Sequence, residues 1–364
     1  MGNRVSVRSP APSHLRYLDG LRGIAILMVM MVHSSQLVMG LSTSARNFTF
    51  YGVRGVQLFF IVSGLTLAIN YADRPFHLVN FAARRFFRIA PMFYFGAILY
   101  LMLALTTTIP LSTRGSGSID ILATFLFLHG WVPGAINKVV PGGWSIAAEA
   151  MFYVIFPGLL LIRRPAVLGG FVLACYVAAG MLNLVLRRLA GGSAEGMEFA
   201  LYFWPVQLPA FAGGCWLATQ CQKQREPSPF AIGSLIVCLG CLVIDSQFRG
   251  RSNLLVAIAL LTLFVWAVGR TRPIVLEGWF LPLIGRISFS LYIFHFLVLS
   301  LLRPLAEPTE ALFGASVAFC FIYLATISLT GIVAYASYHW IEIPIIASTR
   351  QIGLSAEVKE SRVG

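Results

Sequence analysis

Long apolar runs, separated by short polar connections, follow one another from residue 18 to residue 340. A transmembrane helix needs about 20 mainly apolar residues, because the hydrocarbon core of a bilayer is about 30 Å thick. About ten runs are long enough, so the pattern predicts an all-α polytopic membrane protein with about ten transmembrane helices. The predicted helices cover residues 18–40, 53–71, 89–108, 144–162, 166–186, 199–219, 229–245, 253–269, 284–303 and 313–340.

Two stretches need a separate interpretation. Residues 119–132 are apolar but too short to cross a bilayer, and Gly and Pro flank them. We expect a re-entrant or interfacial segment there, packed against protein. The first run, residues 18–40, is too long for the apolar region of a typical signal peptide and carries Arg22 and His33, so we expect it to stay in the mature protein.

Composition supports a membrane protein throughout. Hydrophobic residues make up 58% of the 364 residues and charged residues only 11%, whereas soluble domains average about 25% charged residues. The mean hydropathy of +0.80 is therefore a property of the whole chain. Since no polar stretch is long enough to form a soluble domain, we predict a transmembrane domain over residues 1–348 and a short cytoplasmic tail over residues 349–364.

The net charge of +13 indicates topology and contact with anionic lipid headgroups. With ten spans, most Lys and Arg residues fall on the side of the N-terminus, and the positive-inside rule then places both termini in the cytoplasm. A nucleic-acid partner is not expected, because no dense basic run stands beside stacking aromatic residues in a polar segment.

Ionisable side chains within the apolar runs are the first candidates for chemistry, because each costs about 2.5–3.5 kcal/mol to insert at mid-membrane. Arg22 and His33 are eleven residues apart, which is about three helical turns and about 16.5 Å, so they share one face of a helix. A packed, hydrogen-bonded histidine and a boundary arginine are the structural alternative.

Two further ionisable residues fall near the same depth. Glu149 lies about 7.5 Å along its run from Trp144, where its carboxylate could pair with His33 and fix the imidazole tautomer. A structural ion pair with an arginine is the alternative. His295 lies near mid-membrane, and Tyr292 precedes it by three residues, so both could line one cavity. For His295 a structural role is the stronger interpretation.

A basic cluster, formed by Arg84, Arg85 and Arg88, precedes the third run. It fits a positive-inside anchor equally well as a phosphate clamp, because guanidinium groups bind phosphates in a bidentate manner. Ser63, in FFIVSG, falls near mid-membrane in the second run. Packing between helices is a better interpretation for this serine than nucleophilic catalysis.

Six motifs in this order resemble the acyltransferase-3 family of integral membrane O-acyltransferases. They are LDGLRG (18–23) with the Arg22 to His33 spacing, FFIVSG (59–64), RRFFRIAP (84–91), WSIAAEAMFYVIFP (144–157), GRISFSLYIFHF (285–296) and IEIP (341–344). The last motif departs from the family's more frequent Glu-Lys-Pro. The resemblance implies a ten-helix core in the cell inner membrane, cytosolic acyl-CoA, most simply acetyl-CoA, as donor, and a carbohydrate such as exopolysaccharide or O-antigen precursor as acceptor.

The expected mechanism combines this resemblance with the polar residues. His33 would be the general base, oriented by Glu149, and Arg22 would assist the basic cluster of Arg84, Arg85 and Arg88 in holding the phosphates of coenzyme A. Trp144, Tyr292, His295 and Ser63 would form the substrate side, without a metal ion. A proton-coupled transporter or flippase is the alternative function, because His and Glu also build proton relays within membranes.

Overall fold

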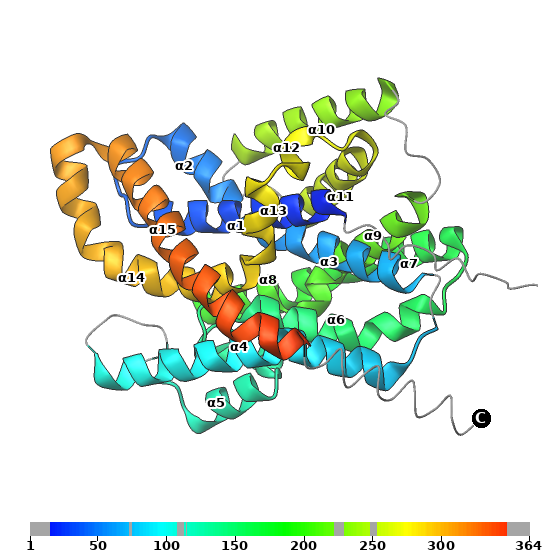
Figure 1. The fold of residues 1–364 in the computed structure, drawn as a ribbon, viewed down its shortest axis with the longest axis horizontal. Helices are drawn as coiled ribbons and strands as arrows, with labels where there is room; N and C mark the ends of the chain where they lie inside the picture. The colour runs from blue at the N-terminus through cyan, green and yellow to red at the C-terminus, as the bar shows by residue number, and fades with distance from the viewer. Residues whose placement is uncertain are drawn as a thin grey trace, which may run out of the picture.

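The protein is a bundle of helices (Figure 1). The computed structural model describes residues 15–72, 75–107, 113, 115–221, 229–247 and 253–347, and within these residues every regular element is helical. The predicted all-α class is therefore confirmed. The long helices are α1 (Arg16–Ser35), α3 (Gly55–Tyr71), α4 (Leu78–Thr106), α6 (Trp144–Leu160), α7 (Pro165–Leu189), α9 (Trp204–Cys221), α10 (Pro229–Gln247), α11 (Leu254–Thr271), α14 (Ser288–Phe313) and α15 (Ala315–Ser337).

Each long helix overlaps one of the predicted apolar runs, and shorter helical elements connect them. These are α2 (Thr43–Phe50), η1 (Tyr51–Arg54), α5 (Ser118–Phe125), η2 (His129–Trp131), η3 (Pro133–Ala135), α8 (Ala194–Tyr202), α12 (Ile274–Glu277), α13 (Phe280–Arg286) and the π-helical turn η4 (Tyr338–Glu342). Residues 119–132 form α5 and η2, and a helix of eight residues reaches only about 12 Å. This segment is too short to span a bilayer, as its length predicted.

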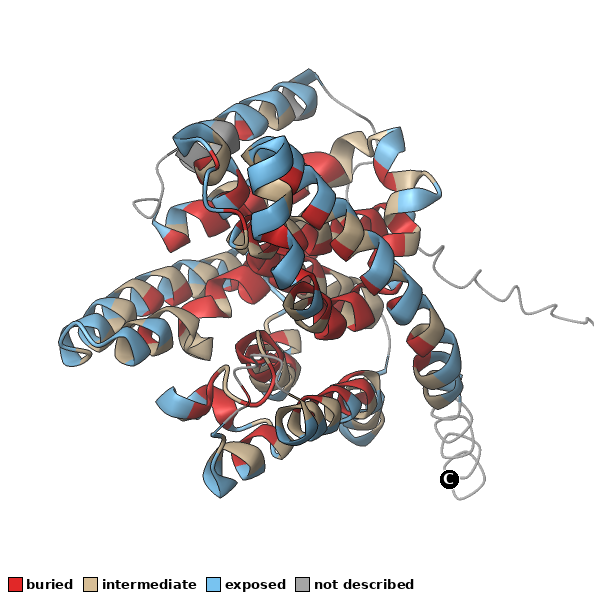
Figure 2. Cartoon of the chain, turned by 90° about the vertical axis from the view of Figure 1, so that its left-hand side faces the viewer, coloured by how far each residue is buried: buried red, intermediate tan, exposed pale blue. Residues whose placement is uncertain are grey.

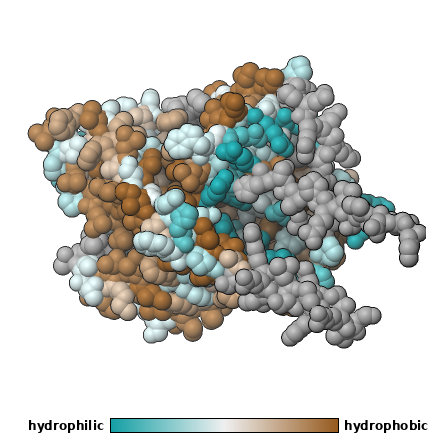
Figure 3. Space-filling view, viewed as in Figure 1, coloured by the Kyte–Doolittle hydropathy of each residue, from teal (hydrophilic) through white to brown (hydrophobic). Residues whose placement is uncertain are grey.

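Seven helical segments are long and apolar enough to cross a membrane within the described residues. They contain α1, α3, α4, α7, α11, α14 and α15, while Trp144–Leu160 and Ile232–Cys241 are shorter apolar helices. Apolar side chains cover much of the outer face over α2, α14 and α15 (Figure 3). The protein is thus a multi-pass membrane protein, whereas the number of ten spans stays a prediction. Both chain ends, whose cytoplasmic position we predict, lie outside the described residues.

Helix α1 runs through the middle of the bundle, in contact with α3, α13, α14 and α15 (Figure 1). Buried residues concentrate around this centre, and exposed residues lie on the outer helices (Figure 2). The glycines of LDGLRG explain the close packing: a Cβ atom on Gly20 would clash with the backbone of Leu276, and one on Gly23 with the backbone of Leu281. The motif therefore fixes α1 against α12 and α13.

Helix α4 begins at Leu78, about eleven residues before the predicted span. The arginines of RRFFRIAP are consequently helical, and their side chains point in directions set by the helical repeat of 100° per residue. This extension brings part of the basic cluster to the interior of the bundle.

Candidate active site

A cavity lined by three arginines, here called the arginine cavity, opens between α1, α3, α4, α6 and α14. Arg22 comes from α1, and Arg85 and Arg88 come from α4. Ser63 and Glu149 line the same cavity from α3 and α6. This concentration of positive charge, with one carboxylate among the arginines, suits a ligand that carries several negative charges.

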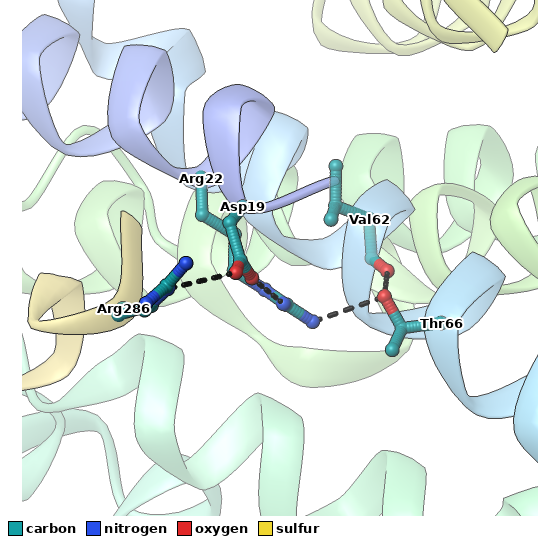
Figure 4. Close-up of polar contacts among 5 residues, drawn as sticks. All are labelled: Asp19, Arg22, Val62, Thr66 and Arg286. Carbon is teal, nitrogen blue, oxygen red and sulfur yellow. Dashed lines mark hydrogen bonds and ion pairs between the residues drawn. The ribbon is translucent and has the colours of Figure 1, made fainter. Parts of the chain in front are cut away.

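Arg22 is held in place from two sides (Figure 4). Its Nη1 donates a hydrogen bond of 3.0 Å to Oδ1 of Asp19, one turn earlier, and its Nη2 donates one of 3.0 Å to Oγ1 of Thr66 on α3. The other carboxylate oxygen of Asp19 lies 3.5 Å from Nε of Arg286. The buried Asp19 therefore orients two guanidinium groups from α1 and α13.

Arg85 and Arg88 reach the arginine cavity, whereas Arg84 lies on the exposed side of α4. The Nε of Arg84 donates a hydrogen bond to the carbonyl oxygen of Asn80 in its own helix. Arg85 packs over the ring of Tyr153 at 5.7 Å from the centroid. Of the three arginines in this cluster, Arg85 and Arg88 line the arginine cavity and Arg84 does not.

Glu149 belongs to the arginine cavity, where its Oε1 accepts hydrogen bonds from Ser63 Oγ at 2.9 Å and from Tyr153 Oη at 2.7 Å. The predicted pairing of Glu149 with His33 is wrong in this structure. The sequence predicts similar depths for the two residues along their helices, but their side chains line different cavities. Matching depth does not fix the direction of a side chain around the helix axis.

His33 lines a second cavity, here called the histidine cavity. Its Nδ1 lies 3.2 Å from Oε1 of Gln36. Because the amide oxygen only accepts hydrogen bonds, Nδ1 carries the proton and Nε2 keeps its lone pair. Gln36, which the sequence analysis missed, thus orients the imidazole in the way predicted for Glu149.

His33 packs against other rings on α14. Its ring centroid lies 4.4 Å from that of Phe296 and 5.4 Å from that of His295. His295 is completely buried, and its Nδ1 lies 2.7 Å from the carbonyl oxygen of Tyr292. His295 is not among the residues that line the arginine cavity or the histidine cavity, and its ring packs against those of His33 and Phe296, so its role on the substrate side stays a prediction.

The far wall of the histidine cavity combines aromatic and polar groups. The rings of Trp144 and Tyr202 stack with centroids 4.3 Å apart. Beside them, Nδ2 of Asn137 donates a hydrogen bond of 2.5 Å to Oε1 of Glu198, and both residues line the cavity. An aromatic surface beside hydrogen-bonding groups suits a polyhydroxylated ligand, which presents apolar ring faces and hydroxyl groups together. Trp144, which the sequence analysis singled out, lines this cavity, whereas Asn137, Glu198 and Tyr202 fall in segments without a recognisable motif.

The two cavities meet at a common wall. Val56 from α3 and Tyr292 from α14 line both of them. The hydroxyl group of Tyr292 accepts a hydrogen bond of 2.9 Å from Ser145 Oγ and donates one of 2.9 Å to the carbonyl oxygen of Gly142. The two cavities therefore adjoin at these two side chains. No cluster of three metal-ligating residues occurs among the residues that the structure describes.

The fold and the paired cavities define a polytopic membrane protein in which an arginine-lined cavity adjoins a cavity lined by a histidine. Comparison with known proteins then gives the family. The chain belongs to the acyltransferase-3 family, because the family model, described as an acyltransferase domain, matches residues 15–335. It is a membrane acyltransferase. Neither the family nor the relatives described next support a transporter.

Three relatives are similar in sequence to most of the chain. The exopolysaccharide production protein ExoZ of Rhizobium meliloti is 28% identical over 300 residues, which cover 78% of this chain and 87% of ExoZ. The O-acetyltransferase OatA of Staphylococcus aureus is 24% identical and covers 92% of this chain, and the peptidoglycan O-acetyltransferase OatA of Listeria monocytogenes is 23% identical and covers 90%. The matches span only 58% and 55% of these two OatA proteins. No solved structure matches the chain.

Proposed function

We propose that the protein transfers an acyl group, most simply acetyl, from cytosolic acyl-CoA to a hydroxyl group of a carbohydrate at the cell inner membrane. The observation that carries this proposal is the contact between the arginine cavity and the histidine cavity at Val56 and Tyr292. The names of the relatives, an exopolysaccharide production protein and two O-acetyltransferases, favour an acetyl group and a glycan acceptor.

The arginine cavity would take the donor. Coenzyme A carries several phosphate groups, and Arg22, Arg85 and Arg88 offer forked donors from two helices. The thioester at the other end of coenzyme A carries no charge. It would extend along the aromatic wall of the cavity, formed in part by Phe59, toward Tyr292.

The histidine cavity would take the acceptor, with His33 as general base. Nε2 of His33 accepts the proton of the hydroxyl group while the hydroxyl oxygen attacks the thioester carbonyl carbon. The bond between this carbon and sulfur breaks, an ester forms, and the thiolate of coenzyme A leaves. The imidazolium then returns its proton to the thiolate, so His33 ends the cycle neutral, with its Nδ1–H still bonded to Gln36.

The acceptor would lie against the stacked rings of Trp144 and Tyr202. Asn137 and Glu198 supply hydrogen-bonding groups at the same wall. Glu198 is exposed and negatively charged, so this arrangement favours a neutral sugar unit over an anionic one.

The test compares purified wild-type protein with His33→Ala and with His77→Ala, an exposed histidine before α4. Radiolabelled acetyl-CoA is used to measure binding, and mass spectrometry of the cell glycans detects transfer. We expect His33→Ala to bind acetyl-CoA and lose transfer by about 10²–10⁴-fold, the usual contribution of a general base, and His77→Ala to match the wild type. A wild-type protein that binds no acyl-CoA, or normal transfer in His33→Ala, would refute the proposal.

A further inference from the structure

The junction between the cavities restricts where the reaction can occur. A donor in the arginine cavity and a hydroxyl group in the histidine cavity must reach one carbonyl carbon. That carbon must therefore lie at the wall that the two cavities share, against Val56 and Tyr292. We infer that these two side chains determine the length of the acyl group, and this inference rests on the proposed function.

Tyr292 is a fixed part of the wall. Its hydroxyl group bonds both to Ser145 and to the carbonyl oxygen of Gly142, each at 2.9 Å. Gly142 has a φ of +76°, and a Cβ atom there would lie 2.8 Å from the Tyr292 hydroxyl oxygen. Glycine thus permits both the turn and the close approach of the tyrosine. These two hydrogen bonds hold the hydroxyl group, and with it the ring, against the segment from Gly142 to Ser145.

Val56 is fixed by the backbone that carries it. The preceding residue, Gly55, packs so closely on α1 that a Cβ atom would clash with the carbonyl oxygen of Ala25. Gly52, one turn earlier, is packed in the same way on Met28. Since α3 is already in backbone contact with α1, Val56 cannot retreat from a longer acyl chain. A wall that cannot retreat would favour a short acyl group, such as acetyl, over a longer one.

The experiment enlarges this wall and compares acyl-CoA thioesters of increasing length. Purified Val56→Ala, Val53→Ala and wild-type protein are loaded with radiolabelled acetyl-CoA, which is then displaced by propionyl-CoA or butyryl-CoA. Val53 lines the histidine cavity but not the arginine cavity. Val53→Ala therefore removes the same two methyl groups as Val56→Ala, but away from the shared wall. We expect Val56→Ala to favour the longer thioesters by about fourfold for each added methylene, which corresponds to about 0.8 kcal/mol. The wild type and Val53→Ala should keep one common order of affinities.

A second variant tests the opposite change. Val56→Ile adds one methylene to the wall, and we expect it to bind free coenzyme A as the wild type does but to lose affinity for acetyl-CoA. If wild-type protein binds acetyl-CoA and the order of affinities is the same in all variants, the inference is wrong and the proposed function stands. The inference also fails if Val53→Ala changes the order as much as Val56→Ala. If the wild type binds no acyl-CoA, both fail.

Discussion

Removing the charge of Asp19 tests how the arginine cavity, the proposed donor site, is organised. In Asp19→Asn the amide oxygen still accepts the hydrogen bond from Arg22 Nη1, but the negative charge between Arg22 and Arg286 disappears. The side chain of Asp19 is only 6% exposed, whereas those of Arg22 and Arg286 are 24% and 46% exposed. The substitution therefore leaves two like charges facing a neutral group in the interior.

The expected cost follows from this burial. Breaking a fully buried ion pair costs about 3–5 kcal/mol, and an exposed pair contributes about 0–1 kcal/mol. The pair with Arg22 is intermediate, and part of its hydrogen bonding is retained, so we expect a loss of about 1–3 kcal/mol. If this loss falls on the orientation of Arg22 in the donor complex, kcat/KM for acetyl-CoA decreases by roughly 5- to 150-fold, since 1.4 kcal/mol is a factor of ten.

A competing effect has the opposite sign. Without Asp19 the pocket carries one more net positive charge, which attracts the phosphates of the donor. Salt screens the attraction between the pocket and the phosphates of the donor, because the Debye length is about 8 Å at 0.15 M ionic strength. Salt does not correct a guanidinium group that points in the wrong direction. Transfer assays at low and high salt therefore separate the two effects. We expect the defect of Asp19→Asn to persist and to deepen at high salt.

The control is Asp120→Asn, because Asp120 accepts a hydrogen bond from the backbone of Gly117 at the start of α5, away from both cavities. This variant should keep wild-type transfer at both salt concentrations. Wild-type kcat/KM in Asp19→Asn would show that Arg22 needs no partner to bind the donor, and the account of the pocket given above would be wrong.

Three other substitutions address the remaining parts of the site. Gln36→Ala removes the hydrogen-bond acceptor for His33 Nδ1 and should lower kcat by roughly 2- to 12-fold, the effect of losing about 0.5–1.5 kcal/mol. Gln36→Glu should restore the activity, and equal rates in the wild type and both variants would exclude a positioning role for Gln36. Glu149→Gln should keep the wild-type pH dependence of transfer, because its partners lie in the arginine cavity; a shifted pH profile would restore the pairing with His33. Arg85→Glu should weaken the binding of acetyl-CoA in an equilibrium assay and Arg84→Glu should not, so equal losses would place the donor outside the cavity.

The positions of the long helices could be predicted from the sequence because a bilayer imposes one simple requirement, a sufficient apolar length. Each predicted run overlaps a long helix. The ends of the helices were harder to predict. Residues 78–88, which mix apolar residues with Asn and Arg, are helical although they lie outside the predicted span, since an amphipathic start of α4 can pack on other helices. Hydropathy alone contains no information about such packing.

The candidate site was only partly accessible. The spacing of Arg22 and His33 identified two cavity residues, because positions on one helix have fixed angles and distances. Glu149 was paired with the wrong residue, because two helices of unknown rotation leave the contacts between them undetermined. Asp19 and Gln36 had a usable signal, a polar residue three positions from Arg22 and from His33 respectively.

Helix α1 contributes a residue to both cavities, so the arginine cavity and the histidine cavity depend on one rigid element. In the proposed function it carries Arg22 for the donor and His33 for the acceptor, at a fixed separation of about 16.5 Å. Backbone contacts at Gly20 and Gly23 fix α1 against α12 and α13, so the helix as a whole is held in place as well. Selectivity for the acyl group must then arise where the separation is spanned, at the shared wall. A movement of α1 would disturb both cavities together, and this coupling gives a physical reason for a close-packed LDGLRG segment beside the pocket.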